Sequence, residues 1–231
     1  MRQAGAMNAR RAGNRSFEPC AVGRPAEAAP RVADMFGDLV ATQPRQLLED
    51  AEEGIAYTPG FVAPEVAARW FVVLRDGIAW QSQRRPMYDR VVDVPRLTAT
   101  WWLDDPALPG ALAEAAALLQ PALGHPFNAV GLNFYRDGRD SVALHNDKLH
   151  SLVPGHPIAL LSLGAPRRMT IRAKPPAKQV QRIDLAPGSL LVMSHASQHT
   201  HEHGIAKTTA PVGERISLAF RVRPSTRAGG M

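Results

Sequence analysis

The sequence contains a single cysteine, Cys20, among 231 residues, so no disulfide can form within the chain. A disulfide-stapled scaffold is therefore excluded, and the scarcity of cysteine favours a reducing compartment. The chain also lacks any apolar run of about 18 residues, the length that a helix needs to cross a bilayer. We expect a cytoplasmic protein with no membrane partner, and we expect it to be a monomer.

Acidic residues are scarce in the second half of the chain. Residues 131–231 contain 14 Lys and Arg against 6 Asp and Glu, whereas residues 1–130 contain 13 against 15. Such a concentration of positive charge favours polyanionic partners, nucleic acid above all. A basic surface that serves only solubility explains the charge equally well at this point.

Large apolar side chains are scarce at the amino terminus. Residues 1–34 are rich in Ala, Arg, Gly and Pro, and such a segment cannot bury enough surface to offset the entropy of ordering it. We interpret it as a disordered tail. The segment has no apolar core of the kind that a secretory signal requires.

From Gly54 onward the sequence has the pattern of a folded domain. A short strand is expected near Gly54–Tyr57, and helical spacing of apolar residues predicts helices near 63–75 and 109–122. After Pro126 short apolar runs alternate with turn residues, which is typical of an antiparallel sandwich or barrel. The expected strands are 129–135, 141–145, 158–163, 168–172, 179–185, 189–193 and 215–222.

The most specific feature is His145-Asn146-Asp147 at the end of an expected strand. Side chains alternate along a strand, so His145 and Asp147 project to the same face. Together they offer two of the three ligands of the two-histidine, one-carboxylate triad of non-haem iron enzymes. The motif alone is weak, because chance supplies it often.

Four histidines further along could supply the third ligand. If the chain is extended there, His199, His201 and His203 share one face, and His195 lies just before them. Such a cluster is also compatible with a zinc site or with a solvated polar strand.

The segment Arg215–Arg221 alternates strictly between apolar and other side chains. Ile216, Leu218 and Phe220 lie on one face, so Arg215 and Arg221 lie on the other. Two guanidinium groups on an inward face are costly without anions, and a small dicarboxylate could satisfy both. If this face is exterior, it is an ordinary solvated surface.

These segments together resemble the AlkB-type nucleic-acid dioxygenases of the 2-oxoglutarate/iron(II) superfamily. The resemblance covers about residues 54–223, in both order and spacing. It is carried by Val94–Thr98, Asn133–Gly138, His145–Asp147, Ile158–Gly164, Arg167–Arg168, Gly188–Met193, His203–Ile205 and Arg215–Arg221.

The resemblance implies a mainly β (α+β) fold, a double-stranded β-helix or jelly roll with an N-terminal helical layer and a nucleotide-recognition lid. It places helices and lid in residues 35–125 and the catalytic core in residues 126–231, within one functional domain. The implied cofactors are Fe(II), 2-oxoglutarate and O2. The implied roles are iron binding by His145, Asp147 and His203, and 2-oxoglutarate binding by Asn133, Tyr135, Arg215 and Arg221.

The resemblance further implies oxidative demethylation of an alkylated base in DNA or RNA, taken from a single strand or flipped from a duplex. Basic and aromatic side chains are available for such a substrate. The candidates are Tyr88, Arg96, Trp101, Trp102, Arg167, Arg168, Arg172 and Lys174. Core packing of the tryptophans and an exposed basic hairpin are equally ordinary explanations.

Two departures from the family pattern leave the substrate open. Family members usually have an acidic residue within two positions of the iron aspartate, where this chain has Lys148-Leu149-His150. A Trp-Tyr pair that is common in the lid corresponds to Thr100-Trp101. An oxygenase of a protein or small molecule is therefore one alternative, and a non-catalytic zinc-binding jelly roll is another.

Overall fold

The computed structural model describes residues 43–87 and 90–224. The predicted tail over residues 1–34 and the candidate Tyr88 lie outside these residues. Within the described part, no helix is long and apolar enough to cross a bilayer.

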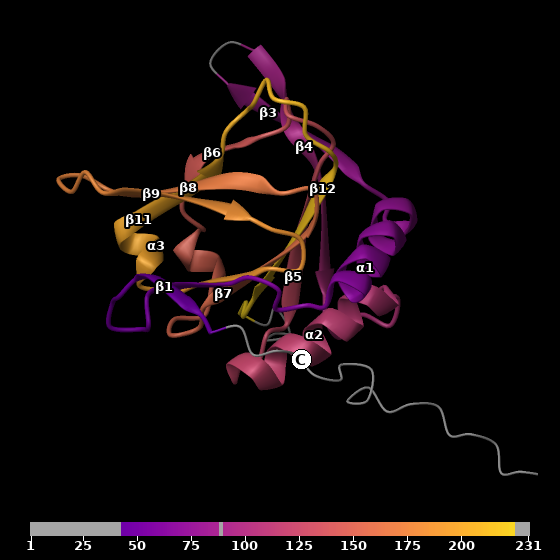
Figure 1. The fold of residues 1–231 in the computed structure, drawn as a ribbon, viewed down its shortest axis with the longest axis horizontal. Coiled ribbons are helices and arrows are strands. Elements are labelled where there is room, and N and C mark those ends of the chain that lie inside the picture. The colour runs from indigo at the N-terminus through magenta and orange to yellow at the C-terminus, as the bar shows by residue number, and fades with distance from the viewer. Residues whose placement is uncertain (1–42, 88–89, 225–231) are drawn as a thin grey trace, which may run out of the picture. The chain divides into compact units, whose positions relative to one another are not determined.

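The described residues form two antiparallel sheets (Figure 1). The large sheet has the strand order β1-β2-β10-β7-β12-β5-β4-β3, and the small sheet has the order β6-β11-β8-β9. The strands of the large sheet are β1 (Arg45–Leu48), β2 (Ile55–Thr58), β3 (Gln81–Met87), β4 (Arg90–Trp102), β5 (Ala129–Tyr135), β7 (Ile158–Gly164), β10 (Leu190–Met193) and β12 (Arg215–Arg221). Those of the small sheet are β6 (Val142–His145), β8 (Arg167–Ala173), β9 (Val180–Leu185) and β11 (His201–Ile205).

Apolar side chains from both sheets meet in one core. Strand β8 alternates between buried and more exposed residues, so that Met169 and Ile171 point inward while Arg168 and Arg172 point out. The cluster joins them to Tyr57, Leu160 and other residues of the large sheet. Two sheets packed face to face in this way form the jelly roll that the sequence predicts.

Two helices cover the outer face of the large sheet (Figure 1). Helix α1 (Pro64–Gly77) has Pro at its first position and buries Trp70 and Leu74 at helical spacing. It packs against β7 and β12. Helix α2 (Gly110–Leu123) lies beside it, and Trp70 Nε1 donates a hydrogen bond of 2.8 Å to Glu114.

The region before residue 126 contributes more strand than the sequence pattern indicates. The sequence predicts helices there and a short strand near 54–57, whereas β1, β2, β3 and β4 all join the large sheet. Strand β4 pairs with β5 over Leu97–Trp102, and β5 in turn pairs with β12. The inner face of the sheet therefore continues from β12 across β5 to β4. This extension brings β4 side chains toward the candidate site.

Candidate metal centre

Three side chains from different parts of the chain converge at one edge of the small sheet. One nitrogen or oxygen each of His145, Asp147 and His203 lies within 4.8 Å of the others. His145 ends β6 and pairs in register with His203 of β11, while Asp147 follows two residues after the strand end. Of the four histidines that the sequence offers downstream, only His203 belongs to this group among the described residues.

A hydrogen bond orients the His145 imidazole, and a glycine allows the strand that bears His203 to approach it. His145 Nδ1 lies 2.9 Å from the carbonyl oxygen of Ala143, which can only accept, so Nδ1 carries a proton and Nε2 is the nitrogen left to bind a metal. A β-carbon on Gly204 would lie 2.9 Å from Val142 O. Glycine is therefore needed after His203 for β11 to approach β6 this closely.

Burial sets the protonation of the group. Desolvation, reinforced by the neighbouring His145, lowers the pKa of His203 to about 4, so its ring is neutral near pH 7. Burial opposes ionisation of Asp147, yet the Arg221 guanidinium holds the pKa of that carboxyl below its ordinary value. Two imidazoles and one carboxylate are a donor set suited to a divalent metal.

The two arginines of β12 lie on the inner face of the large sheet. Arg215 is fully buried and its Nε donates to Ser162 Oγ at 2.9 Å, and Ser162 stands opposite Ser217 in register. Arg221 Nε donates to Asp147 Oδ2 at 2.6 Å, while its NH1 reaches back to Ala219 O at 2.9 Å. The space between the two guanidiniums therefore lies over Ser217 and Ala219.

Arg215 has two nitrogens that need a partner. Nη1 and Nη2 are buried and donate no hydrogen bond to any residue that the structure describes. Burial lowers the pKa of Arg215 to about 10, so the side chain is still a cation near pH 7. A buried cation with unpaired donors is costly, and a bound carboxylate would satisfy both nitrogens.

Strand β5 supplies the polar neighbours that the sequence predicts. Asn133 and Tyr135 stand opposite Ser217 and Arg215 in register. Tyr135 is buried between two guanidiniums, with Arg215 Cζ at 5.2 Å and Arg167 Cζ at 5.6 Å from the ring centroid. The β-carbon of any larger residue at Gly131 would approach Arg221 NH1 to 3.1 Å, so glycine leaves room for this side chain.

The comparison with protein families agrees with this geometry. The model of the 2OG-Fe(II) oxygenase superfamily matches residues 54–221. The chain belongs to this superfamily. Fe(II), 2-oxoglutarate and O2 are the cofactors that the family implies, and the triad and the unpaired Arg215 nitrogens fit an iron ion and a carboxylate.

The curated proteins that the chain resembles are AlkB-like dioxygenases. The chain is 34% identical over 191 residues to the rat alpha-ketoglutarate-dependent dioxygenase alkB homolog 3, an alignment that covers 73% of this chain and 64% of the rat protein. It is 37% identical over 105 residues to the human DNA oxidative demethylase ALKBH2, covering 42% and 40% of the two chains. The chain thus spans just under two thirds of the length of the rat relative. A solved structure of OsALKBH1 shares the fold, with a TM-score of 0.54 at 16% identity over 78% of this chain and all of that one.

One candidate nucleic-acid contact is wrong. The sequence predicts that Arg167 contacts phosphate, but the residue is only 4% exposed. Its guanidinium donates to the backbone carbonyls of Asp137, Asp140 and Ala206 at 2.9–3.0 Å. Arg167 therefore ties a turn to β8 and β11, because side chains of odd-numbered residues on β8 point into the molecule.

The other basic residues proposed for nucleic-acid binding form ion pairs or hydrogen bonds within the protein. On the outer face of β8, Arg168 pairs with Asp184 at 2.8 Å and Arg172 pairs with Glu202 at 2.7 Å. Lys174 Nζ donates to Gln198 O at 2.9 Å. Arg96 donates to Asn133 Oδ1 at 2.7 Å, which brings it to the polar strip of the inner sheet face.

The two tryptophans of β4 point to opposite faces of the sheet. Trp102 stands opposite Ala129, which in turn stands opposite Arg221, so Trp102 lies on the inner face at the metal end. Its ring is 36% exposed and available for contact. Trp101 stands opposite the buried Val130, on the face that the helices cover. Only Trp102 is thus placed to meet a ligand near the triad.

Two buried polar residues of the site were not predicted. Ser162, the hydrogen-bond acceptor of Arg215 Nε, is a lone polar residue inside the apolar run of β7, and that interruption was a usable signal. Gln198 accepts a hydrogen bond from Asp147 N at 3.0 Å. Its sequence context gave no such signal, because the contact joins residues far apart in the chain.

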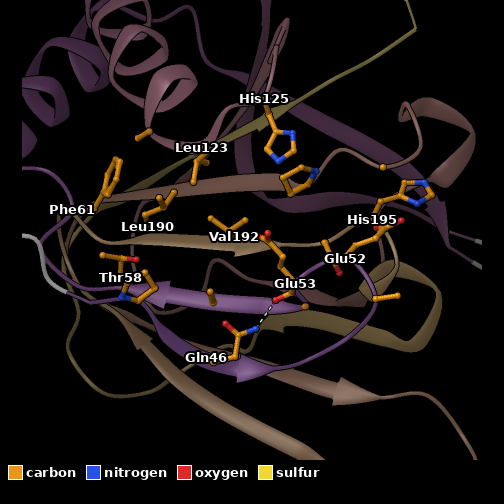
Figure 2. Close-up of a pocket in the computed structure, with 18 of the residues that line it drawn as sticks. Gln46, Glu52, Glu53, Thr58, Phe61, Leu123, His125, Leu190, Val192 and His195 are labelled. Atoms are coloured by element: carbon orange, nitrogen blue, oxygen red, sulfur yellow. Dashed lines mark hydrogen bonds between the residues drawn. The ribbon is translucent and has the colours of Figure 1, made fainter.

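A large cavity lies away from the triad. It has a volume of about 710 Å³ and is lined by residues that include Ala56, Leu190 and Val192 (Figure 2). The alternate residues of the same strands, such as Tyr57 and Leu191, belong to the core between the sheets. The cavity therefore opens on the outer face of the large sheet, and it is not the metal centre.

Proposed function

We propose that this chain is an Fe(II)- and 2-oxoglutarate-dependent dioxygenase that oxidatively demethylates alkylated bases in DNA or RNA. The observation that carries the proposal is the meeting of His145, Asp147 and His203 beside Arg221, at one end of a polar strip that leads to Arg215. In this proposal the three residues hold the iron, and they leave coordination positions open for cosubstrate and dioxygen.

The polar strip is the proposed seat of 2-oxoglutarate. Arg215 would grip one carboxylate with its two unpaired nitrogens, while Arg221 lies at the end of the strip next to the metal. Asn133 and Tyr135 flank the space between them on β5. Arg96 holds the Asn133 carboxamide by its oxygen, which leaves the amide nitrogen directed toward Ser217, 3.5 Å away.

The bound iron and 2-oxoglutarate would supply the oxidising chemistry. The protein's own contribution is placement and charge. His145 presents Nε2 because Ala143 O holds the Nδ1 proton, and His203 is neutral because it is buried. The Arg221 guanidinium keeps Asp147 ionised and holds one of its oxygens, so the other oxygen is directed to the metal.

Several features support a nucleic-acid substrate. Relatives in rat and human bear names that refer to alkB homolog 3 and to DNA oxidative demethylation. The half of the chain with the triad has 14 basic residues against 6 acidic ones, which suits a polyanion. Trp102, partly exposed at the metal end of the inner face, provides a surface on which a base could stack.

One observation favours a second candidate, an oxygenase that acts on a protein or small molecule. The residues after Asp147 are Lys148, Leu149 and His150, and Lys148 and His150 are exposed. Family members that read damaged bases usually have an acidic residue there. Basic residues in that position would favour a substrate that carries a negatively charged group there.

Mass spectrometry of methylated oligonucleotides tests the proposal. Single- and double-stranded DNA and RNA with different N-methylated bases are incubated with the protein, Fe(II), 2-oxoglutarate and ascorbate. We expect loss of a methyl group from at least one substrate, together with succinate and formaldehyde, and no loss with Asp147→Ala. Succinate formation that no oligonucleotide stimulates would favour the second candidate instead.

A further inference from the structure

The metal centre is supported by a buried amide that belongs to neither the metal ligands nor the cosubstrate strip. Gln198 lies in the short helix α3 (Ser197–Thr200), which directly precedes β11 and His203. Its side chain is buried, with the residue only 2% exposed. Its Oε1 accepts a hydrogen bond of 3.0 Å from the backbone N–H of Asp147. Gln198 thus bridges the segments that bear two of the three ligands.

The neighbours of Gln198 allow only one orientation of its carboxamide. Asp147 N–H is a donor, so it requires Oε1. Ser197 Oγ donates its own proton to Ser194 O at 2.7 Å, and it therefore accepts from Gln198 Nε2 at 3.2 Å. Both ends of the amide are satisfied in one arrangement, and the flipped arrangement would lose both hydrogen bonds.

The same network is anchored on the β1–β2 connection. Ser194 Oγ accepts from Ser197 N at 2.9 Å and donates to Asp50 Oδ2 at 2.6 Å. Asp50 is itself fixed, because its other oxygen accepts from the backbone of Glu52 and Gly54 at 2.8 Å. A continuous set of hydrogen bonds therefore leads from a tight loop to the backbone of Asp147.

Asp147 needs this support because it lies outside regular structure. Strand β6 ends at His145, and the next element begins at Leu149. Arg221 holds the carboxylate, but it does not fix the backbone from which that carboxylate projects. The Gln198 contact supplies the missing restraint on the main chain, close to the point where β11 begins toward His203.

We propose that Gln198 is a positioning residue of the iron site, which sets the distance between the Asp147 carboxylate and the His203 imidazole. This inference rests on the proposed function, because it takes the triad to be the metal site. Residues that orient ligands in this way change metal affinity by about 10–100-fold when they are replaced. Gln198→Met keeps the length of the side chain and removes the acceptor, so it is the most direct variant.

Cobalt(II) binding under anaerobic conditions, followed by its visible absorption, tests the proposal without turnover. We expect Gln198→Met to bind Co(II) about 10–100-fold more weakly than the unmodified chain, with an altered spectrum that reports changed ligand geometry. Gln120→Met is the matched control. Gln120 also donates one side-chain hydrogen bond, of 3.1 Å to Phe127 O. It lies on α2 and contacts none of the three ligands, so Gln120→Met should leave the Co(II) affinity unchanged.

Ser197→Ala provides a second, milder variant. It removes the hydroxyl that orients Gln198 but leaves the acceptor for Asp147 N–H, so a smaller loss of affinity, about 3–10-fold, is expected. If Gln198→Met lowers the melting temperature but binds Co(II) as the unmodified chain does, Gln198 is merely structural and the proposal fails. If the unmodified chain binds no Co(II), or if Asp147→Ala binds it as tightly as the unmodified chain does, the proposed iron site itself fails.

Discussion

Single residues near the metal centre are arranged for ligands that the protein itself does not provide. Arg215 is the clearest case, because its guanidinium is fully buried and Nε donates to Ser162 Oγ, while Nη1 and Nη2 have no hydrogen-bond partner in the part of the chain that the structure describes. A folded protein rarely retains such a group unless it has a use. Under the proposed function, Arg215 would lower the stability of the free protein and raise its affinity for an anion.

Replacing Arg215 should separate binding from stability. We expect Arg215→Met to weaken 2-oxoglutarate binding on the order of 100-fold or more, since a charge-assisted, bidentate contact is lost. The free energy of unfolding of the ligand-free protein should be unchanged or higher, by up to about 2 kcal/mol, because an unpaired buried cation is removed. Calorimetric titration and urea denaturation measure the two quantities. A large loss of stability with intact 2-oxoglutarate affinity would contradict the assignment.

Strand β8 shows at the element scale how neighbouring arginines can have opposite roles. Arg167 is buried and donates to three backbone carbonyls, whereas Arg168 is exposed and pairs with Asp184. We expect Arg167→Met to destabilise the protein by about 3–5 kcal/mol, because buried carbonyls lose their donor. Arg168→Met, the matched control, should have little effect on stability, because its ion pair with Asp184 is exposed and screened by solvent. Equal effects in chemical denaturation would refute this distinction.

The carboxyl group of Asp140, in the turn that Arg167 holds, should make the stability of the protein depend on pH. Burial disfavours the charged form of Asp140, but its hydrogen bonds with Arg136 outweigh burial and lower the pKa of the carboxyl. Because the folded-state pKa lies below the ordinary value, the stabilisation is present above pH about 4 and is lost as pH falls through the lowered pKa. Asp140→Asn should therefore cost about 1–2 kcal/mol at pH 7, since Arg136 is half-exposed, and progressively less below pH 4. A cost that is independent of pH would contradict this account.

Elements differed in how far the sequence could predict them. The predicted bounds of β5 agree with the structure, because a buried strand flanked by Pro126 and Asp137-Gly138 has clear limits. Strands β1, β3, β4 and β11 were not predicted, since their polar or irregular sequences lack a clear strand pattern and pairing with other strands defines them. The triad could be inferred from spacing and family resemblance. The shared face of Arg215 and Arg221 could be predicted from alternation along one strand, but the Gln198 contact joins residues 51 positions apart and cannot be deduced locally.

The proposed site joins both sheets of the molecule, so we expect its ligands to stabilise the fold. Iron would be held by residues of and beside the small sheet, and 2-oxoglutarate by β5 and β12 of the large one. Ligands that bind only the folded state stabilise it by about 2.7 kcal/mol at 100 times their dissociation constant. We expect Mn(II) and 2-oxoglutarate each to raise the melting temperature. Asp147→Ala should abolish the rise in melting temperature that Mn(II) causes, and Arg215→Met should abolish the rise that 2-oxoglutarate causes. If both rises persist in these variants, the ligands bind elsewhere.

The central claim, that the triad and the arginine pair form one iron and 2-oxoglutarate site, is tested most directly by visible spectroscopy. Fe(II) is added to the protein without oxygen, followed by 2-oxoglutarate. The account predicts a charge-transfer absorption that needs both additions and disappears in Asp147→Ala and in Arg215→Met. Absence of this absorption in the unmodified chain, with tight zinc binding instead, would contradict the account and favour a non-catalytic jelly roll.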